Sequence, residues 1–251
     1  MKAAEAERSP LPRVLLAPDP GPVLAFAPHP DDDVLGAGLT LRLHRLQGDP
    51  VRMIVVYDGA LGRLGGTRAE GEEREALVRL RREESLAGGR ILGVVDYEFW
   101  NYPEGHLPGP ADLIAAAERV AEVVRRDAPA TVYAPWVGEQ HVDHHALGRA
   151  VRLGLALADF RGTALGYEVW SPLQPTLVVD VSAAYEEKAR ALLAHRSQTV
   201  DTDLVHMVRG LNAHRSLYLP KGSRYGEAFA PLGAPHPEDA ALIAGRAPAG
   251  G

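Results

Sequence analysis

The sequence predicts an α/β fold of the Rossmann-like type, in which a mainly parallel sheet carries helices on both faces. Two observations support it: short apolar runs alternate with longer segments of helical periodicity, and polar clusters directly follow two of the apolar runs. Short runs that are apolar throughout are typical of strands buried on both faces, as in a parallel sheet. Ligands of such sheets bind beyond the carboxyl ends of the strands, so we expect both clusters to belong to one site there.

The N-terminal half supplies two strand–helix units. Residues 22–27 are an apolar run typical of a buried strand, and residues 34–46 carry leucines at helical spacing and end before Gly48. Residues 51–57 predict a second strand, and a segment rich in Arg and Glu predicts a helix from about 70 to 92. The Gly-rich stretch between them matches neither the dinucleotide fingerprint nor the P-loop, so we expect a loop at the rim of a pocket.

The same alternation continues through the middle of the chain. Residues 96–100 predict a strand, and residues 110–127 predict a helix that begins at a proline, which is favoured in the first helical turn. Residues 131–136 are another apolar run of the strand type. Residues 145–157 have helical periodicity and predict the helix that follows.

The last third continues the pattern with shorter segments. Apolar runs predict strands at residues 164–170 and 176–181, and helical spacing predicts a helix at residues 183–195. No internal repeat or linker interrupts the pattern, and the length suits one α/β domain. We therefore expect a single domain with two terminal tails, at residues 21–235, 1–20 and 236–251.

Composition restricts the chemistry and the partners. The chain has no cysteine, so disulfides, thiolate ligands and a cysteine nucleophile are excluded, and a metal site must use His, Asp and Glu. The net charge of −6 gives no general attraction to nucleic acid or anionic membranes, so we expect neither as a partner. No run reaches the roughly 18 apolar residues that span a bilayer. The N-terminus lacks the apolar segment of a secretory signal, so a cytoplasmic location is expected.

Two polar clusters carry the candidate chemistry. The first reads APHPDDD over residues 27–33, and the second reads GEQHVDHH over residues 138–145. Catalytic zinc commonly takes three His or carboxylate ligands and keeps a fourth position for water, whose pKa it lowers. A further carboxylate can act as general base, and a further imidazole can donate a hydrogen bond to the developing oxyanion. The two clusters together contain all of these parts.

A simpler interpretation exists for each cluster taken alone. Acidic residues near a helix N-terminus satisfy free backbone N–H groups and favour the helix dipole, which would explain the first cluster without a metal. The adjacent His29 and the distant HxDH pattern favour a metal site instead. Asp33 is the acid best explained as a cap or a supporting group, and His145 is best explained as a surface residue.

The pattern AxHPDDx at residues 27–33, joined by HxDHxxxG at residues 141–148, resembles the PIG-L/LmbE family of zinc-dependent N-acetyl deacetylases. The segment RxxE at 81–84 and several segments of the last third are also similar, so the resemblance extends over roughly residues 22–231. The resemblance implies three metal ligands, namely His29, Asp32 and His144. It implies three catalytic residues: Asp31 as general base, His141 as oxyanion stabiliser and proton donor, and Asp143 as the group that holds His141 through a hydrogen bond.

The resemblance also implies contacts with the substrate. Arg81 corresponds to an arginine near the substrate, and Glu104 lies in a loop that more often reads PDGxL. Asp58 replaces an acid that is usually found after the next glycine. Asp33 stands where the family usually has Glu, which can alter the orientation of a ligand without abolishing metal binding.

The function implied is hydrolysis of the acetamide of an amino-sugar substrate, a small N-acetylated sugar or glycoconjugate, with Zn²⁺, Fe²⁺ or another divalent ion as cofactor. Two alternatives stay open: a metallo-hydrolase for another amide or a phosphoester, and a sugar-binding relative without turnover. The resemblance also allows a homo-oligomer, although no apolar stripe marks an interface.

Overall fold

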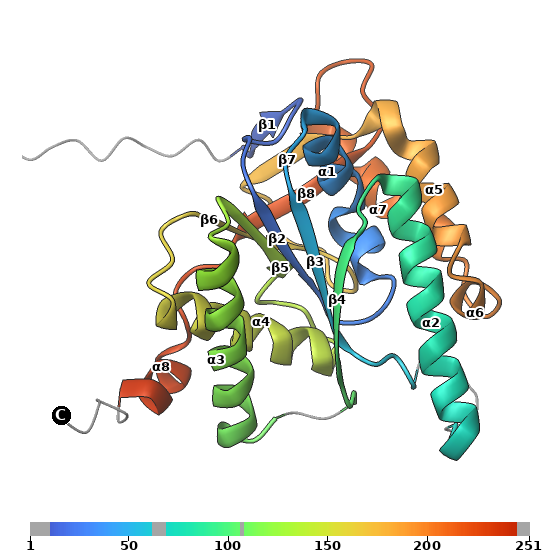
Figure 1. Ribbon diagram of the computed structural model, residues 1–251. Coiled ribbons are helices and arrows are strands. Elements are labelled where there is room, and N and C mark those ends of the chain that lie inside the picture. Colours follow the sequence, from blue (N-terminus) through green and yellow to red (C-terminus); the bar gives the residue numbers. More distant parts are fainter. Residues whose placement is uncertain (1–10, 62–68, 106–107, 245–251) are drawn as a thin grey trace, which may run out of the picture.

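The structure is a computed structural model that describes residues 11–61, 69–105 and 108–244. Part of the expected rim loop and the outer part of each expected tail lie outside these residues. Within them the chain forms one eight-stranded sheet in the order β1-β7-β8-β6-β5-β2-β3-β4, covered by helices on both faces (Figure 1). No helix in the described ranges is both long enough and apolar enough to cross a membrane.

The strands are β1 (Arg13–Leu15), β2 (Val23–Ala27), β3 (Val51–Tyr57), β4 (Asp96–Tyr102), β5 (Thr131–Pro135), β6 (Thr163–Tyr167), β7 (Leu177–Asp180) and β8 (Gly226–Pro231). The α-helices are α1 (Asp32–Gln47), α2 (Gly71–Leu92), α3 (Pro110–Asp127), α4 (Val142–Leu157), α5 (Tyr185–Leu193), α6 (Arg196–Thr199), α7 (Leu204–His214) and α8 (Pro237–Ala244). Neighbouring strands are parallel except where β8 pairs antiparallel with β6 and β7. The prediction of a mainly parallel α/β sheet is therefore confirmed.

Successive side chains of the central strands point to opposite faces of the sheet and form a hydrophobic core on each face. On β2, Val23, Ala25 and Ala27 face one core, while Leu24 and Phe26 face the other. Helices α1, α2, α5 and α7 cover the first face, and α3, α4 and α8 cover the second (Figure 1). A strand buried on both sides has no polar face, which is why residues 22–27 lack polar side chains.

Several elements of the structure differ from the expectation. The segments expected as tails carry β1, which pairs with β7, and α8, whose Asp239 forms a two-pronged ion pair with Arg149 of α4. A three-residue edge strand is too short to show periodicity. Helix α7 and strand β8 were not predicted, although α7 begins after Asp203, whose carboxylate accepts the His206 N–H at 2.9 Å as an N-cap.

A buried ion pair links both α1 and α5 to β8. Lys188 and Glu227 are fully buried, and the Lys188 ammonium lies 2.7 Å from the Glu227 carboxylate. Glu227 also accepts the backbone N–H groups of Leu39 and Thr40 at 3.0 and 2.7 Å, and the Thr40 hydroxyl at 2.7 Å. The carboxylate therefore fixes the middle of α1, the helix whose first turn carries Asp32.

Replacing Glu227 by Gln should destabilise the protein strongly. The Lys188 ammonium would remain buried without an anion, and loss of one partner of a buried pair costs about 3–5 kcal/mol. Urea unfolding followed by circular dichroism measures the change. The control is Glu75→Gln, because the Glu75 carboxylate is exposed and lies 3.6 Å from Arg79 on the surface of α2. Equal losses in the two variants would contradict this role for Glu227.

Candidate active site

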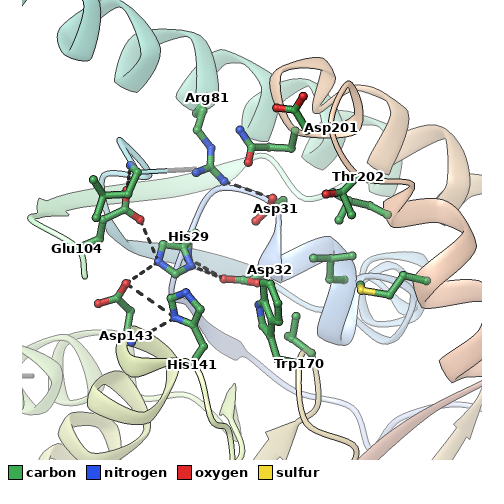
Figure 2. A pocket seen from close by; sticks show the side chains of 16 residues that line it. His29, Asp31, Asp32, Arg81, Glu104, His141, Asp143, Trp170, Asp201 and Thr202 are labelled. Atoms are coloured by element: carbon green, nitrogen blue, oxygen red, sulfur yellow. Dashed lines mark hydrogen bonds and ion pairs between the residues drawn. The ribbon is translucent and has the colours of Figure 1, made fainter. Parts of the chain in front are cut away.

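The two polar clusters meet at the carboxyl ends of β2 and β5, as expected. His29 follows β2 by two residues, Asp32 begins α1, and Asp143 and His144 lie in the first turn of α4. His29, Asp32 and Asp143 line a cavity of about 400 Å³ (Figure 2), and His144 lies behind Asp32, with its Nε2 3.1 Å from Asp32 Oδ2. Because β2 and β5 are adjacent parallel strands, the chain segments that leave them must start at the same edge of the sheet.

The first cluster turns sharply between strand and helix. Asp31 has φ 153° and ψ −25°, a conformation that L-residues rarely adopt. Its carbonyl accepts the N–H groups of Val34 and Leu35 at 3.0 and 2.9 Å, which starts α1. Strained backbone of this kind often occurs at functional sites, where the surrounding structure imposes it. The Asp31 side chain lines the cavity.

The three predicted metal ligands lie together and are buried. Asp32 Oδ2 lies 3.0 Å from His29 Nδ1 and 3.1 Å from His144 Nε2. Two ligands of a tetrahedral zinc ion with bonds near 2.0–2.1 Å are separated by about 3.4 Å, so these spacings are close to those of a ligand set. Neither ring nitrogen of His144 makes a hydrogen bond of good geometry, although the side chain is fully buried. A buried imidazole in this state is suited to bind a cation.

More donors are present than the three predicted ligands. Among the described residues, ligand atoms within 4.8 Å of one another form two groups, His29 with His141 and His144, and His29 with Glu104 and Asp143. Neither group contains Asp32, in spite of its short distances to both imidazoles. The structure thus supports a His/carboxylate metal site, and the choice of ligands within it stays a prediction.

His29 lies at the centre of this cluster and carries a shifted pKa. Burial alone would lower the pKa of the imidazole, but hydrogen bonds to Asp143, Asp32 and Glu104 raise it well above its ordinary value. Its Nε2 lies 3.0 Å from Asp143 Oδ2 and 3.2 Å from Glu104 Oε2. The negative charges of three carboxylates around one imidazole stabilise a positive charge at this place, and a bound divalent cation would supply that charge as well.

Glu139 supports His144 from behind, a role that the sequence analysis missed. Its buried carboxylate lies 3.3 Å from His144 Nδ1 and accepts the backbone N–H groups of three consecutive residues, Val169, Trp170 and Ser171, at 2.8, 3.3 and 3.2 Å. Carboxylates behind a ligating imidazole commonly fix its orientation. An acid placed just before the HxDH pattern was the available signal.

Asp31 and Arg81 form a buried pair at the cavity wall. Burial raises the pKa of Asp31 to about 7, although the Arg81 charge acts in the opposite direction. Arg81 donates to Asp31 Oδ2 at 3.3 Å, to the Gly59 carbonyl at 2.7 Å and to the Pro30 carbonyl at 3.2 Å. The guanidinium lines the cavity, as expected of a substrate contact, but its bonds go to groups of the protein itself.

His141 lies at the edge of the cavity, and its side chain is 32% exposed. The expected hydrogen bond between the His141 ring and the Asp143 carboxylate is absent, because Asp143 Oδ2 lies 3.9 Å from His141 Nδ1 and only 3.0 Å from His29 Nε2. The backbone N–H of Asp143 instead donates to His141 Nδ1 at 3.3 Å. A neutral ring that accepts at Nδ1 carries its proton on Nε2. Burial and the neighbouring imidazoles of His144 and His29 lower the pKa of His141, which favours this neutral form.

The other two predicted substrate contacts differ in their positions. Glu104 lines the cavity, pairs with His29 and accepts the Leu61 N–H. Asp58 does not line the cavity, because its carboxylate accepts the Ala60 N–H at 3.1 Å and pairs with Arg74. A short side chain bonded to its own loop cannot reach a ligand, so the geometry does not support a substrate contact for Asp58.

The sequence did not place Asp33, His195 and His145 in the site, and the structure shows where each of them lies. Asp33 points away from the cavity and accepts the Tyr97 hydroxyl at 2.6 Å. His195 is fully buried against Gly88, and burial lowers its pKa to about 3, so the ring is neutral. His145 is exposed, which confirms its interpretation as a surface residue.

Part of the cavity lining was not predicted. It includes Leu35, Val169, Trp170, Gln198, Asp201, Thr202, Leu204 and Met207. The apolar spacing of Leu204 and Met207 after the capping Asp203 was a signal for this part of the wall. Trp170 was expected within a strand, but β6 ends at Tyr167.

An α/β sheet that collects imidazoles and carboxylates around one cavity beyond its parallel strands defines the class, a hydrolase of the metal-dependent type. The chain belongs to the GlcNAc-PI de-N-acetylase (PIG-L) family, whose model matches residues 24–153. The matched range contains both polar clusters and every predicted site residue, so the resemblance found in the sequence is confirmed.

Individual relatives extend the likeness beyond the matched range. The chain is 29% identical over 195 residues to a probable N-acetyl-alpha-D-glucosaminyl L-malate deacetylase 2 of Bacillus cereus, covering 70% of this chain and 83% of that one. The solved N,N′-diacetylchitobiose deacetylase of Pyrococcus horikoshii superimposes with a TM-score of 0.69 at 26% identity, covering 83% and 82% of the two chains. GalB of Pseudomonas putida, a 4-carboxy-2-hydroxymuconate hydratase, also gives 0.69 at 20% identity, covering 84% and 95%. That last likeness shows the fold alone, so the reaction must be argued from the site.

Replacing Glu139 by Gln should weaken binding of a divalent cation. Loss of a carboxylate behind a ligating imidazole typically costs about 10–100-fold in metal affinity. Titration of Zn²⁺ into metal-free protein by calorimetry measures the change. The matched control is His145→Ala, which removes an exposed imidazole next to His144 and should bind Zn²⁺ as the unchanged protein does. Unchanged affinity in Glu139→Gln would show that Glu139 does not support a metal ligand.

Proposed function

We propose that this protein hydrolyses the acetamide of an amino-sugar substrate, N-acetylglucosamine or a glycoconjugate that contains it, and releases acetate and a free amine. One observation carries the proposal: the candidate metal ligands His29 and Asp32 line the same cavity as a carboxylate, Asp31, and an imidazole, His141. The family and the two deacetylases described above supply the substrate class.

The proposed cofactor is Zn²⁺, held by His29, Asp32 and His144. Two imidazoles and one carboxylate are a common ligand set of catalytic zinc, and the same set also suits Fe²⁺. When bound, such an ion polarises the acetamide carbonyl and lowers the pKa of a water molecule toward about 7. The ring nitrogens of buried His144 face the carboxylates of Asp32 and Glu139 at 3.1 and 3.3 Å without a hydrogen bond of good geometry, which supports this assignment.

Asp31 is the proposed general base. A base works best when its pKa lies near the operating pH, and burial raises the pKa of Asp31 to about 7. Arg81 holds Asp31 Oδ2 at 3.3 Å, so the carboxylate keeps one orientation while it accepts a proton from the attacking water. Arg81 is accordingly assigned as a positioning residue for Asp31.

His141 is the proposed hydrogen-bond donor to the developing oxyanion. Its Nδ1 accepts the Asp143 N–H, so Nε2–H of the neutral ring can donate to the acetamide oxygen as negative charge develops there. After the water oxygen has bonded to the carbonyl carbon, the C–N bond breaks and the departing nitrogen takes the proton that Asp31 accepted from the water, so the Asp31 carboxylate and the neutral His141 ring are both regenerated. Asp143 orients His141 through its backbone N–H, and its carboxylate holds His29.

The test is acetate release from N-acetylglucosamine and N,N′-diacetylchitobiose by the zinc-loaded protein. Acetate and free amine should appear in equal amounts. Asp31→Asn should lower kcat by about 10²–10⁴-fold, the usual contribution of a general base, while zinc content stays constant. The matched control is Asp33→Asn, because the Asp33 carboxylate lies outside the cavity and should not be required for turnover.

Other outcomes of this test would support one of the two alternative functions, another metallo-hydrolase or a sugar-binding protein. Hydrolysis of a phosphoester or of another amide, with no acetate from either sugar, would replace the proposed substrate. Sugar binding without any hydrolysis would identify a binding protein. Equal turnover in Asp31→Asn and the unchanged protein would remove Asp31 from the role of base.

A further inference from the structure

Trp170 is the exposed tryptophan of the described chain. Its side chain is 60% exposed, whereas Trp100 is buried and the Trp136 indole N–H donates to the Ser171 carbonyl at 2.8 Å. A tryptophan buries 150–250 Å² when it packs into a protein, so an exposed indole gives up a large stabilisation. Exposed apolar surface beside a cavity commonly marks a binding site.

The backbone that carries Trp170 is held firmly. The Glu139 carboxylate accepts the N–H groups of Val169, Trp170 and Ser171, as described above. The Ser171 hydroxyl accepts the Gln140 N–H at 3.1 Å. The indole is therefore exposed although its backbone is fixed by hydrogen bonds, so the ring has a defined position.

That position is the cavity of the candidate active site. Trp170 lines it together with Leu204 and Met207 of α7. The centre of its ring lies 5.7 Å from that of His141 at an angle of 36°. The indole thus lies next to His141, the proposed hydrogen-bond donor to the oxyanion.

Polar side chains line another part of the same wall. Gln198, Asp201 and Thr202 line the cavity, and Figure 2 shows Asp201 and Thr202 toward the top of the view and Trp170 toward the bottom, with Asp32 between them in projection. Glu84 of α2 fixes this segment, because its carboxylate accepts the Ser197 N–H and hydroxyl at 2.8 and 2.6 Å. The cavity therefore offers an aromatic face and a polar edge, each anchored by a buried carboxylate.

We propose that Trp170 and the polar residues Gln198, Asp201 and Thr202 form a subsite that recognises the sugar ring of the substrate. This rests on the proposed function and deepens it. A pyranose has apolar C–H faces and hydroxyl groups around its edge, so one face packs on the indole while the hydroxyls bond to the polar side chains. An acyl chain would offer no hydrogen-bond partner to the amide, carboxylate and hydroxyl groups of these three side chains.

The experiment compares two small probes that are the products of the reaction and are not hydrolysed. Glucosamine contains the ring, and acetate does not. Both are titrated into the zinc-loaded protein and observed by ligand NMR. Trp170→Ala should weaken glucosamine binding about three- to tenfold, the range of an aromatic contact, and leave acetate binding unchanged. Trp170→Phe keeps an aromatic face and should retain most of the affinity.

Two further variants complete the design. Asp201→Ala should weaken glucosamine and not acetate. Leu217→Ala removes an exposed apolar side chain that does not line the cavity and should change neither. Equal glucosamine binding in Trp170→Ala and the unchanged protein, or an equal loss for both probes, would overturn the subsite. Because neither probe is turned over, absence of acetate release from N-acetylated sugars would reject the proposed function and leave this result valid.

Discussion

The site depends on the parallel pairing of β2 with β5. Val23 lies opposite Thr131 and Ala25 opposite Tyr133, so the two strands end at the same edge of the sheet. His29 and Asp143, 114 residues apart, consequently meet at 3.0 Å. A slip of one residue would turn every side chain of a strand to the opposite face. The two hydrophobic cores that prevent such a slip therefore also maintain the distances between the imidazoles and carboxylates.

The two helices that carry Asp32 and His144, α1 and α4, begin at the site and are fixed farther along their length. Helix α1 approaches the sheet closely because Gly36 has no side chain, and a Cβ there would lie 2.1 Å from Tyr167 Cδ2. The Glu227 carboxylate holds its middle. Helix α4 packs along α3 on the other face. Groups on rigid elements keep their geometry better than groups on free loops, and the positive ends of both helices favour the carboxylates there.

Periodicity located most strands and helices and both polar clusters, because strands buried on both sides and helices with one apolar stripe leave clear patterns. Strand β8 escaped because it carries a buried Glu227, whose partner Lys188 lies on another element. The same limit applies to side-chain roles. The sequence could identify Arg81 as a residue near the site, but only the fold shows that its guanidinium bonds Asp31 and two carbonyl groups. Contacts between distant segments have no local sequence signature.

Glu139 contacts both a residue of the proposed metal site, His144, and the residue that carries the proposed sugar-binding indole, Trp170. One carboxylate faces the imidazole of His144 and holds the backbone of Trp170. Any shift of the segment that carries the indole therefore changes the environment of that imidazole. If a sugar ring binds at the indole and a cation binds at His144, as proposed, this carboxylate connects the two sites, and any coupling free energy between them is the same in both directions. Loading with the cation would then change carbohydrate affinity by the same factor by which carbohydrate changes cation affinity.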